Sequence, residues 1–272
     1  MSPWSRKELQ VVLQPDRVTL HRVLRKPSLF GRRSEVTSPQ ELGCAAGDRS
    51  TPWQGALVAL SDALPDHAGD GAVATVYLSN HFVRYTLVPW SAELSGEEEM
   101  TFVRHCFSRI YGEAAQSWQL RLSRAAARAP RLASAVDAEL LDGLRAAFAA
   151  VGIRLRSIQP YLMTALNGIK RGGRGKSAWF AMVEPGNLSL ALLQDGRLVR
   201  LRSVRVGANW QDELELLLER ERLLAESDTV PVDVHVWRQE GEAVLPERVR
   251  WNLLTRSGPF AAASSAAVGM AG

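Results

Sequence analysis

The sequence predicts an α/β protein, in which strands and helices alternate along most of the 272 residues. Three apolar runs between 178 and 206 are joined by the turns EPGN (184–187) and QDG (194–196), which is the pattern of a three-stranded meander. Two further segments, one following Ser95 and one over about 132–151, repeat apolar residues at helical spacing. The composition, 46% hydrophobic and 23% charged, is that of an ordinary globular protein of one large domain or two small ones.

In the first half, turn residues divide the chain into short elements. Ser79-Asn80 is a turn signal inside a run rich in Val, Tyr, Thr and Phe. Ser95, with Glu98 three residues later, forms a capping box, which predicts that a helix begins there. Before residue 53, only VTLHRVL (18–24) shows apolar alternation. The predicted elements are a helix over 53–64, a break over 65–71, two strands or one bent strand over 73–88, the helix after Ser95 and a strand over 117–123.

In the second half, glycine and asparagine mark helix ends. Gly152 is expected to end the helix over about 132–151. Asn209 is expected to cap a helix that begins at Trp210, after the meander. The remaining predicted elements are a strand over 153–158, a helix from Pro160 to about Leu166, a basic flexible connection over 167–176, and strands over 232–237 and 249–254.

Few chemical motifs are present. Cys44 and Cys106 form no CxxC pair, so we expect two reduced thiols and no metal site. The segment GGRGKS (172–177) resembles a phosphate-binding P-loop, but Lys170 stands where that motif requires glycine, and the segment follows a predicted helix instead of a strand. His81 lies between two predicted strands, where a hydrogen-bonded turn histidine is far more common than a catalytic base. We therefore predict no catalytic residue.

The net charge of +4 and the isoelectric point of about 9.4 arise almost entirely from arginine. An isoelectric point above ~9 is one mark of nucleic-acid-binding proteins, but 29 acidic residues nearly balance 33 basic ones. An Arg-rich nucleic-acid-binding module is therefore an alternative hypothesis. The N-terminus lacks an apolar run and no stretch of ~20 apolar residues occurs, so we expect neither a signal peptide nor a membrane span. Residues 259–272 are expected to form a flexible tail.

Three segments, in order, resemble the PilM-type pilus assembly proteins. Residues 73–112 resemble their strand, strand, proline and acid-capped helix. Residues 146–166 resemble their helix, glycine, strand and second helix, and residues 178–214 resemble their strand–turn–strand–strand–helix unit. GspL of type II secretion and the MshI-type proteins share the same fold. The resemblance covers roughly residues 73–226, a little over half of the chain.

The resemblance implies an actin-like (ribonuclease H-like) fold of two lobes, partly degenerate. One lobe is expected over residues 1–130, with a strand–strand–helix insertion, and the other over residues 131–258. The resemblance also implies a non-catalytic cytoplasmic scaffold, peripheral at the inner membrane, of a type IV pilus or type II secretion machine. Such a scaffold binds the cytoplasmic tail of a bitopic membrane partner and contacts an assembly ATPase, but binds no nucleic acid.

In actin-like ATPases, a strand, a glycine-bearing turn and a second strand present amide groups to a phosphate. The corresponding turn here is Glu184-Pro185-Gly186, whose proline lacks an amide donor. A first phosphate loop of the Asp-Ile-Gly kind is not found in VTLHRVLRKPSL (18–29). The resemblance therefore implies a vestigial nucleotide cleft without ATP turnover or a resident cofactor. Its predicted lining residues are Glu184, Gly186, Asn187, Gly207 and Asn209. The alternative is an active ATPase or phosphotransferase of the same fold, which would bind ATP.

Overall fold

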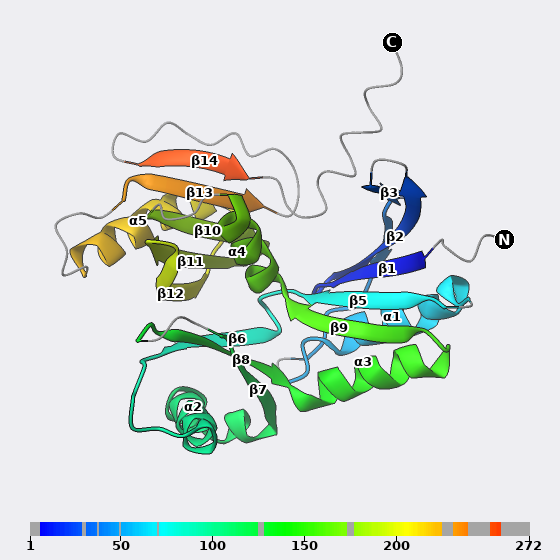
Figure 1. The fold of residues 1–272 in the computed structure, drawn as a ribbon, viewed down its shortest axis with the longest axis horizontal. Helices are drawn as coiled ribbons and strands as arrows, with labels where there is room; N and C mark the ends of the chain where they lie inside the picture. Colours follow the sequence, from blue (N-terminus) through cyan, green and yellow to red (C-terminus); the bar gives the residue numbers. More distant parts are fainter. Residues whose placement is uncertain are drawn as a thin grey trace, which may run out of the picture.

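The computed structural model describes residues 6–28, 31–36, 38–48, 50–69, 71–124, 128–172, 177–224, 231–238 and 251–256. These residues form three β-sheets and five α-helices. Figure 1 shows two larger sheets on either side of helix α4 (Tyr161–Gly172) and a smaller sheet below them. None of the helices in the described residues is both long and apolar enough to cross a lipid bilayer.

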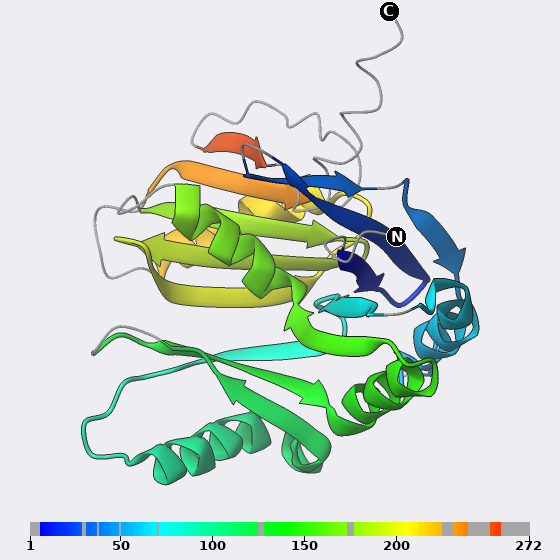
Figure 2. The same ribbon diagram turned by 45° about the vertical axis from the view of Figure 1, so that its right-hand side comes forward.

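The first sheet has the strand order β3-β2-β1-β5-β9, with β4 paired to β2. Its central strand β1 pairs with β2 antiparallel and with β5 parallel, and β5 pairs with β9 parallel. Helices α1 (Gln54–Ala63) and α3 (Ala138–Ala150) bury their apolar residues against this sheet (Figure 2). The strands are β1 (Arg6–Leu13), β2 (Arg17–Ser28), β3 (Gly31–Val36), β4 (Gln40–Gly43), β5 (Val73–Leu78) and β9 (Arg154–Pro160).

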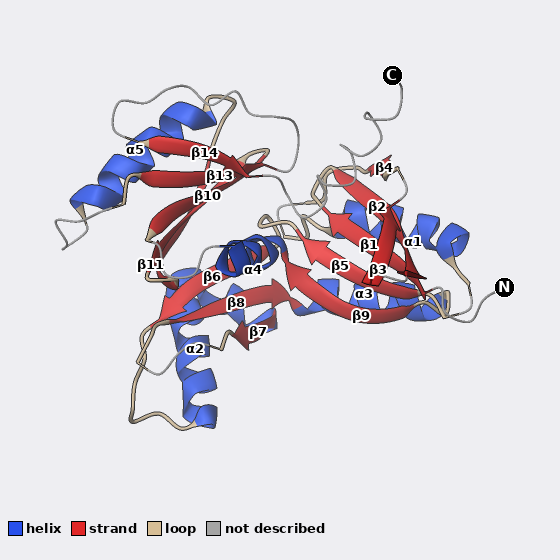
Figure 3. Ribbon diagram, turned by 45° about the horizontal axis from the view of Figure 1, so that its top comes forward, coloured by secondary structure: helices blue, strands red, loops and turns tan. Residues whose placement is uncertain are grey.

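The second sheet repeats this topology. Its order is β12-β11-β10-β13-β14, in which β10 pairs with β11 antiparallel and with β13 parallel. Helix α5 (Trp210–Leu223) covers one face and α4 covers the other, so the inner strands β10 and β11 are buried on both sides (Figure 3). The strands are β10 (Ala178–Glu184), β11 (Asn187–Gln194), β12 (Arg197–Arg205), β13 (Asp233–Arg238) and β14 (Asn252–Arg256).

A third sheet is inserted in the chain between β5 and β9 of the first. It contains β6, β8 and β7 in that order, all antiparallel, and helix α2 (Gly96–Tyr111) packs against it. The strands are β6 (Val83–Val88), β7 (Trp118–Leu122) and β8 (Arg131–Asp137). Short 3-10 turns follow α1 (Leu64–His67) and α2 (Gly112–Ser117). We call this the inserted sheet.

The predicted turn and cap chemistry is confirmed at three positions. The capping box of Ser95 and Glu98 is formed at the start of α2. Gly152 has a φ of 70° just after α3, a backbone conformation that favours glycine. Asp195 and Gly196 have φ values of 49° and 73°, as a two-residue hairpin turn between β11 and β12 requires. The sequence pattern therefore located these boundaries because each depends on a local backbone requirement.

The prediction of a helix from about residue 132 is wrong at its start. Residues Arg131–Asp137 form β8, and α3 begins at Ala138. The alanines of this segment favour a helix, but β8 is the central strand of the inserted sheet and pairs on both sides, so tertiary pairing overrides the local preference. The Asp137 carboxylate then caps α3 by accepting a hydrogen bond of 2.9 Å from the Glu139 amide.

Apolar alternation does not identify β1, because this strand is buried on both faces. Leu9, Val11, Val12 and Leu13 are all at most 5% exposed, and the adjacent apolar residues Val11, Val12 and Leu13 break the alternation that begins at Leu9-Gln10. The first hairpin of the fold lies at Gln14–Asp16, and residues 18–28, where a first phosphate loop was not found, belong to strand β2.

Helix α4 continues to Gly172, beyond the predicted end at Leu166. Most of the P-loop-like segment, residues 173–176, lies outside the described residues, as does the predicted tail over 259–272. The predicted boundary at residue 130 falls inside the inserted sheet, and β9 completes the first sheet. We therefore propose that the two lobes divide after Pro160, where α4 begins.

Candidate functional site

Two hairpins occupy equivalent positions at the carboxyl ends of the two central strands. β1 is followed by Gln14-Pro15-Asp16, and β10 ends at Glu184, followed by Pro185-Gly186. Gly186 has a φ of 77°, which accounts for glycine there. Proline has no amide hydrogen, so each hairpin offers one main-chain donor fewer to an anion.

The loop between β5 and β6 lies against both hairpins. The Ser79 amide donates a hydrogen bond of 3.0 Å to the main-chain oxygen of Leu13, at the end of β1. The Asn80 amide donates to Glu184 Oε2 over 3.0 Å, and His81 Nε2 donates to the main-chain oxygen of Pro185 over 2.8 Å. This loop therefore joins the first lobe to the second hairpin by direct polar contacts.

Glu184 is the most buried acid of this junction, with only 1% of its surface exposed. Its Oε1 atom is buried and has no hydrogen-bond partner among the described residues. Burial raises the pKa of the Glu184 carboxyl, although hydrogen bonds from Ser79 and Asn80 oppose that effect. Beside it, Tyr85 donates a hydrogen bond of 2.8 Å to Asn80 Oδ1, and burial raises the pKa of Tyr85 well above its ordinary value. The carboxyl is thus part of a packed network.

The structure brings three of the five predicted cleft residues together. Glu184, Gly186 and Gly207 line one cavity of about 410 Å³, together with Trp210 and Arg238, whose guanidinium lies 5.5 Å from the indole ring centre. Figure 3 shows that α5, which begins at Trp210, runs along the second sheet that carries the hairpin.

The other predicted residues lie elsewhere in the site. Asn187 lies on a different groove, and Asn209 precedes α5 without a side-chain capping bond. The Gly207 amide already donates to the Glu213 carboxylate over 2.8 Å, so an acid of the protein occupies the place where a helix N-terminus would attract a phosphate. A nucleotide role for these residues remains a prediction.

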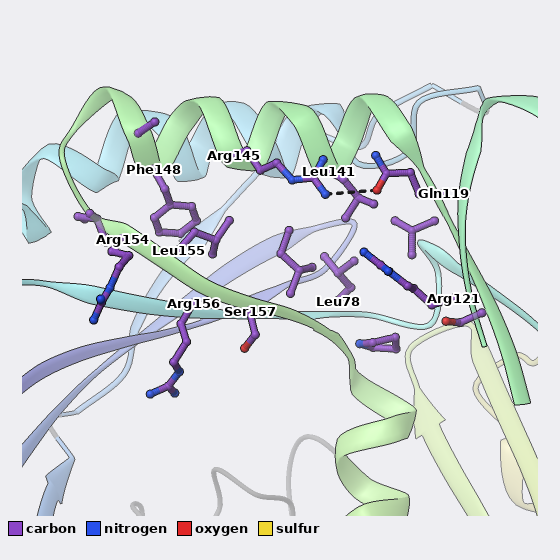
Figure 4. A pocket seen from close by; sticks show the side chains of 16 residues that line it. Leu78, Gln119, Arg121, Leu141, Arg145, Phe148, Arg154, Leu155, Arg156 and Ser157 are labelled. Carbon is purple, nitrogen blue, oxygen red and sulfur yellow. Dashed lines mark hydrogen bonds between the residues drawn. The ribbon is translucent and has the colours of Figure 1, made fainter. Parts of the chain in front are cut away.

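A second concave region, absent from the sequence predictions, runs along β9. It encloses about 630 Å³ between β9, α3 and the inserted sheet, and we call it the β9 groove. Figure 4 shows Phe148 projecting from α3 toward Leu155 on β9 and Leu141 projecting from α3 into the groove farther along, while Arg121 reaches in from β7. Arg145 bridges α3 to Gln119 of β7 through a hydrogen bond of 3.2 Å. The floor is apolar and the rim is polar.

The rim of the β9 groove is positively charged. Arg121, Arg145, Arg154 and Arg156 line it, and none of its described lining residues is acidic. Arg154 and Arg156 extend from β9 on the side away from α3 (Figure 4), and Arg156 pairs with Glu8. Among the described residues β9 pairs only with β5, so its other edge has no neighbouring strand. The alternation of Arg154, Arg156 and apolar residues was the only sequence signal for this feature.

The fold has counterparts among solved structures. The cytoplasmic domain of EpsL, an inner membrane component of the type II secretion system of Vibrio cholerae, has a TM-score of 0.60 and 13% identity over 98% of this chain and 96% of that chain. The PilM–PilN type IV pilus biogenesis complex has a TM-score of 0.61 and 12% identity, over 85% of this chain and 81% of that chain. A Bacteroides thetaiotaomicron protein with an actin-like ATPase fold and unknown function has a TM-score of 0.57 and 12% identity, over 90% of this chain and 87% of that chain.

The chain has an actin-like ATPase fold. The predicted fold class and the predicted likeness to PilM- and GspL-type proteins are thereby confirmed at the level of structure. No protein-family model matches the sequence, and a search of curated proteins finds no match. In this actin-like fold, the two proline-bearing hairpins and the loop between β5 and β6 meet at the junction of the lobes.

Proposed function

We propose that this chain is a non-catalytic scaffold of a type IV pilus or type II secretion machine, which binds the cytoplasmic tail of an inner-membrane partner in the β9 groove. The observation that carries the proposal is the unpaired edge of β9 beside an apolar floor and an arginine rim. The likeness to EpsL, an inner membrane component, and to the PilM–PilN complex supports a place at the cytoplasmic face of such a machine.

The groove has the properties of a strand-addition site. An extended tail that pairs with the free edge of β9 satisfies main-chain hydrogen bonds and places alternate side chains on opposite faces. One set of side chains would face Leu141 and Phe148 on the apolar floor. The other set would face Arg154, on the opposite side of β9, while Arg121 lies at the end of the floor. Neither arginine has an acidic partner among the described residues, so acidic residues in the tail are favoured.

The junction of the lobes supports a scaffold without ATP turnover. Pro15 and Pro185 remove an amide donor from each hairpin. Of the acids in the two hairpins, Glu184 is buried against the Asn80 amide and Asp16 pairs with Arg17 over 3.6 Å. Phosphoryl transfer depends on main-chain donors and on acids that hold Mg²⁺. The assembly ATPase that the resemblance implies as a second partner remains a prediction.

A site-specific crosslinking experiment tests the proposal. A photo-crosslinking amino acid replaces Ser157 in the β9 groove, and Val58, which is 55% exposed on α1, serves as the control position. In native membranes, the Ser157 position is expected to crosslink the cytoplasmic tail of a single-span protein of the pilus or secretion machine. The R121E and R154E variants should reduce this product, whereas R104E on the exposed face of α2 should not. Crosslinks that are unaffected by the groove variants, or no tail product, contradict the proposal.

A further inference from the structure

A second large groove runs along the line where the inserted sheet meets the second sheet. It encloses about 930 Å³ and is lined along its length by residues 83–87 of β6 and residues 199–205 of β12. In Figure 1, β6 lies directly below β12. Each is the last strand of its sheet, and among the described residues β6 pairs only with β8 and β12 only with β11. We call this the β6–β12 groove.

The β6–β12 groove carries more positive than negative charge. Four arginines line it, against the two acids Asp48 and Glu221. Glu221 is buried, and its two oxygens accept hydrogen bonds from Arg200 over 3.3 Å and from Arg202 over 3.2 Å. The charge of Glu221 is therefore already shared by two of the arginines. The four arginines are Arg84, Arg200, Arg202 and Arg205.

The other two arginines are free to bind an anion. Arg84 donates only to main-chain oxygens, of His81 over 2.9 Å and of Val83 over 3.4 Å, so its charge has no carboxylate partner among the described residues. Arg205 is exposed and has no ion-pair partner among those residues. Because a guanidinium binds a carboxylate through two parallel hydrogen bonds, Arg84 and Arg205 on opposite walls favour a ligand with several carboxylates.

We propose that the β6–β12 groove binds an extended acidic segment of a partner protein, which adds as a strand along one of its two free edges. The edges supply unpaired main-chain groups, and the arginines supply the complementary charge. Ile110, 61% exposed and part of the lining, offers an apolar contact for such a segment. The site and its occupant are separate from the β9 groove and do not depend on the proposed function.

Arginine on an edge strand has another common role, the prevention of edge-to-edge aggregation. That role requires no ligand, so a binding measurement separates the two. The probe is a fluorescent eight-residue peptide that alternates Glu and Val, titrated at low salt against the full chain. Two control peptides replace Glu by Lys or place all Glu residues before all Val residues. Fluorescence anisotropy measures the affinity.

The expected result is binding of the alternating acidic peptide in preference to both control peptides. R84E and R205E are each expected to weaken it by roughly tenfold, since each reverses a charge that faces the peptide. R104E, on exposed α2, and R154E, in the β9 groove, should leave the affinity within about twofold. On binding, main-chain amides of β6 or β12 should gain protection from hydrogen exchange.

Three outcomes overturn the proposal. The first is no binding of the alternating peptide, in which case the arginines only protect the edges. The second is loss of binding in R154E but not in R84E or R205E, which assigns the peptide to the β9 groove. The third is displacement of the peptide by Mg–ATP, which makes the β6–β12 groove a nucleotide site. Circular dichroism of each variant shows whether it is folded, and the crosslinking at Ser157 is unaffected by any of these results.

Discussion

The Nε2 atom of His81 donates a hydrogen bond of 2.8 Å to the main-chain oxygen of Pro185. His81 follows the end of β5 in the first sheet, and Pro185 follows the end of β10 in the second. The bond therefore joins the two lobes at the tip of the hairpin that would face a phosphate in an actin-like ATPase. His81 has the role of a hydrogen-bonded turn residue, one of the two roles that the sequence allowed.

Replacing His81 tests how much this contact stabilises the protein. H81A should lower the free energy of unfolding by about 1 kcal/mol, the usual net value of one intramolecular hydrogen bond. H81Q keeps a donor of similar reach and should recover most of that loss. Urea unfolding followed by circular dichroism measures both variants. Equal losses in H81A and H81Q would show that the imidazole acts through packing and not through the hydrogen bond.

The buried carboxyl of Glu184 should make stability depend on pH. Its pKa in the folded state is raised above the ordinary value of 4.5 because the group is buried, so the folded protein holds a proton that the unfolded chain has released. Stability from this group is therefore complete below the ordinary pKa and is lost as the pH rises through the raised pKa. E184Q cannot ionise and should not show this loss.

The measurement for Glu184 is the difference in unfolding free energy between E184Q and the native chain at several pH values. As the pH rises above 4.5, the unfolding free energy of E184Q should increase relative to that of the native chain. The difference should become constant once the native carboxyl is ionised in both the folded and the unfolded state. A difference that does not change with pH would mean that Glu184 has the same protonation in the folded and unfolded chain, against its burial beside Asn80.

Nucleotide should not stabilise the chain. A ligand that binds only the folded state raises its stability in proportion to the logarithm of concentration over the dissociation constant. With Pro15 and Pro185 in the two hairpins, we expect millimolar Mg–ATP to change the melting temperature by less than about 1 °C relative to Mg²⁺ alone. A concentration-dependent rise of several degrees would favour the alternative of an active ATPase.

Most of the second sheet was predictable because its signals are local. The turns at Pro185-Gly186 and Asp195-Gly196 each require a particular backbone conformation, and both mark strand ends correctly. β1 and β8 were missed for the opposite reason. Each is a central strand that needs one partner far away in the sequence, β5 for β1 and β6 for β8, and neither keeps the regular alternation of a half-buried strand.

The candidate sites show the same contrast between local sequence signals and tertiary packing. Glu184, Gly186 and Gly207 were found because they lie at turns, and the structure places them around one cavity. The β9 groove was not found, since it combines α3, β7 and β9, and its only local trace is the alternation of Arg154 and Arg156. A groove between elements depends on tertiary packing, which the periodicity of apolar residues along the sequence does not reveal.

Trp237 provides a test of how α4 is fixed between the lobes. Its ring is 2% exposed, and its centre lies 4.5 Å from that of Tyr161 on α4, with the ring planes at 73°. Its Nε1 atom is buried without a hydrogen-bond partner among the described residues, which costs stability. W237F keeps an edge-to-face aromatic pair and removes the unpaired donor, so its unfolding free energy should stay within about 1 kcal/mol of the native value.

W237A, in contrast, leaves a cavity beside Tyr161. Its free energy of unfolding should fall by about 3–5 kcal/mol, as it does for large-to-small changes in a core. Urea unfolding of both variants measures these free energies. If W237F loses as much unfolding free energy as W237A, then the indole makes contacts that a phenyl ring cannot reproduce. In that case the unpaired Nε1 atom does not lower the net stability. If W237A loses less than about 1 kcal/mol, α4 is not fixed to the second sheet by this ring pair.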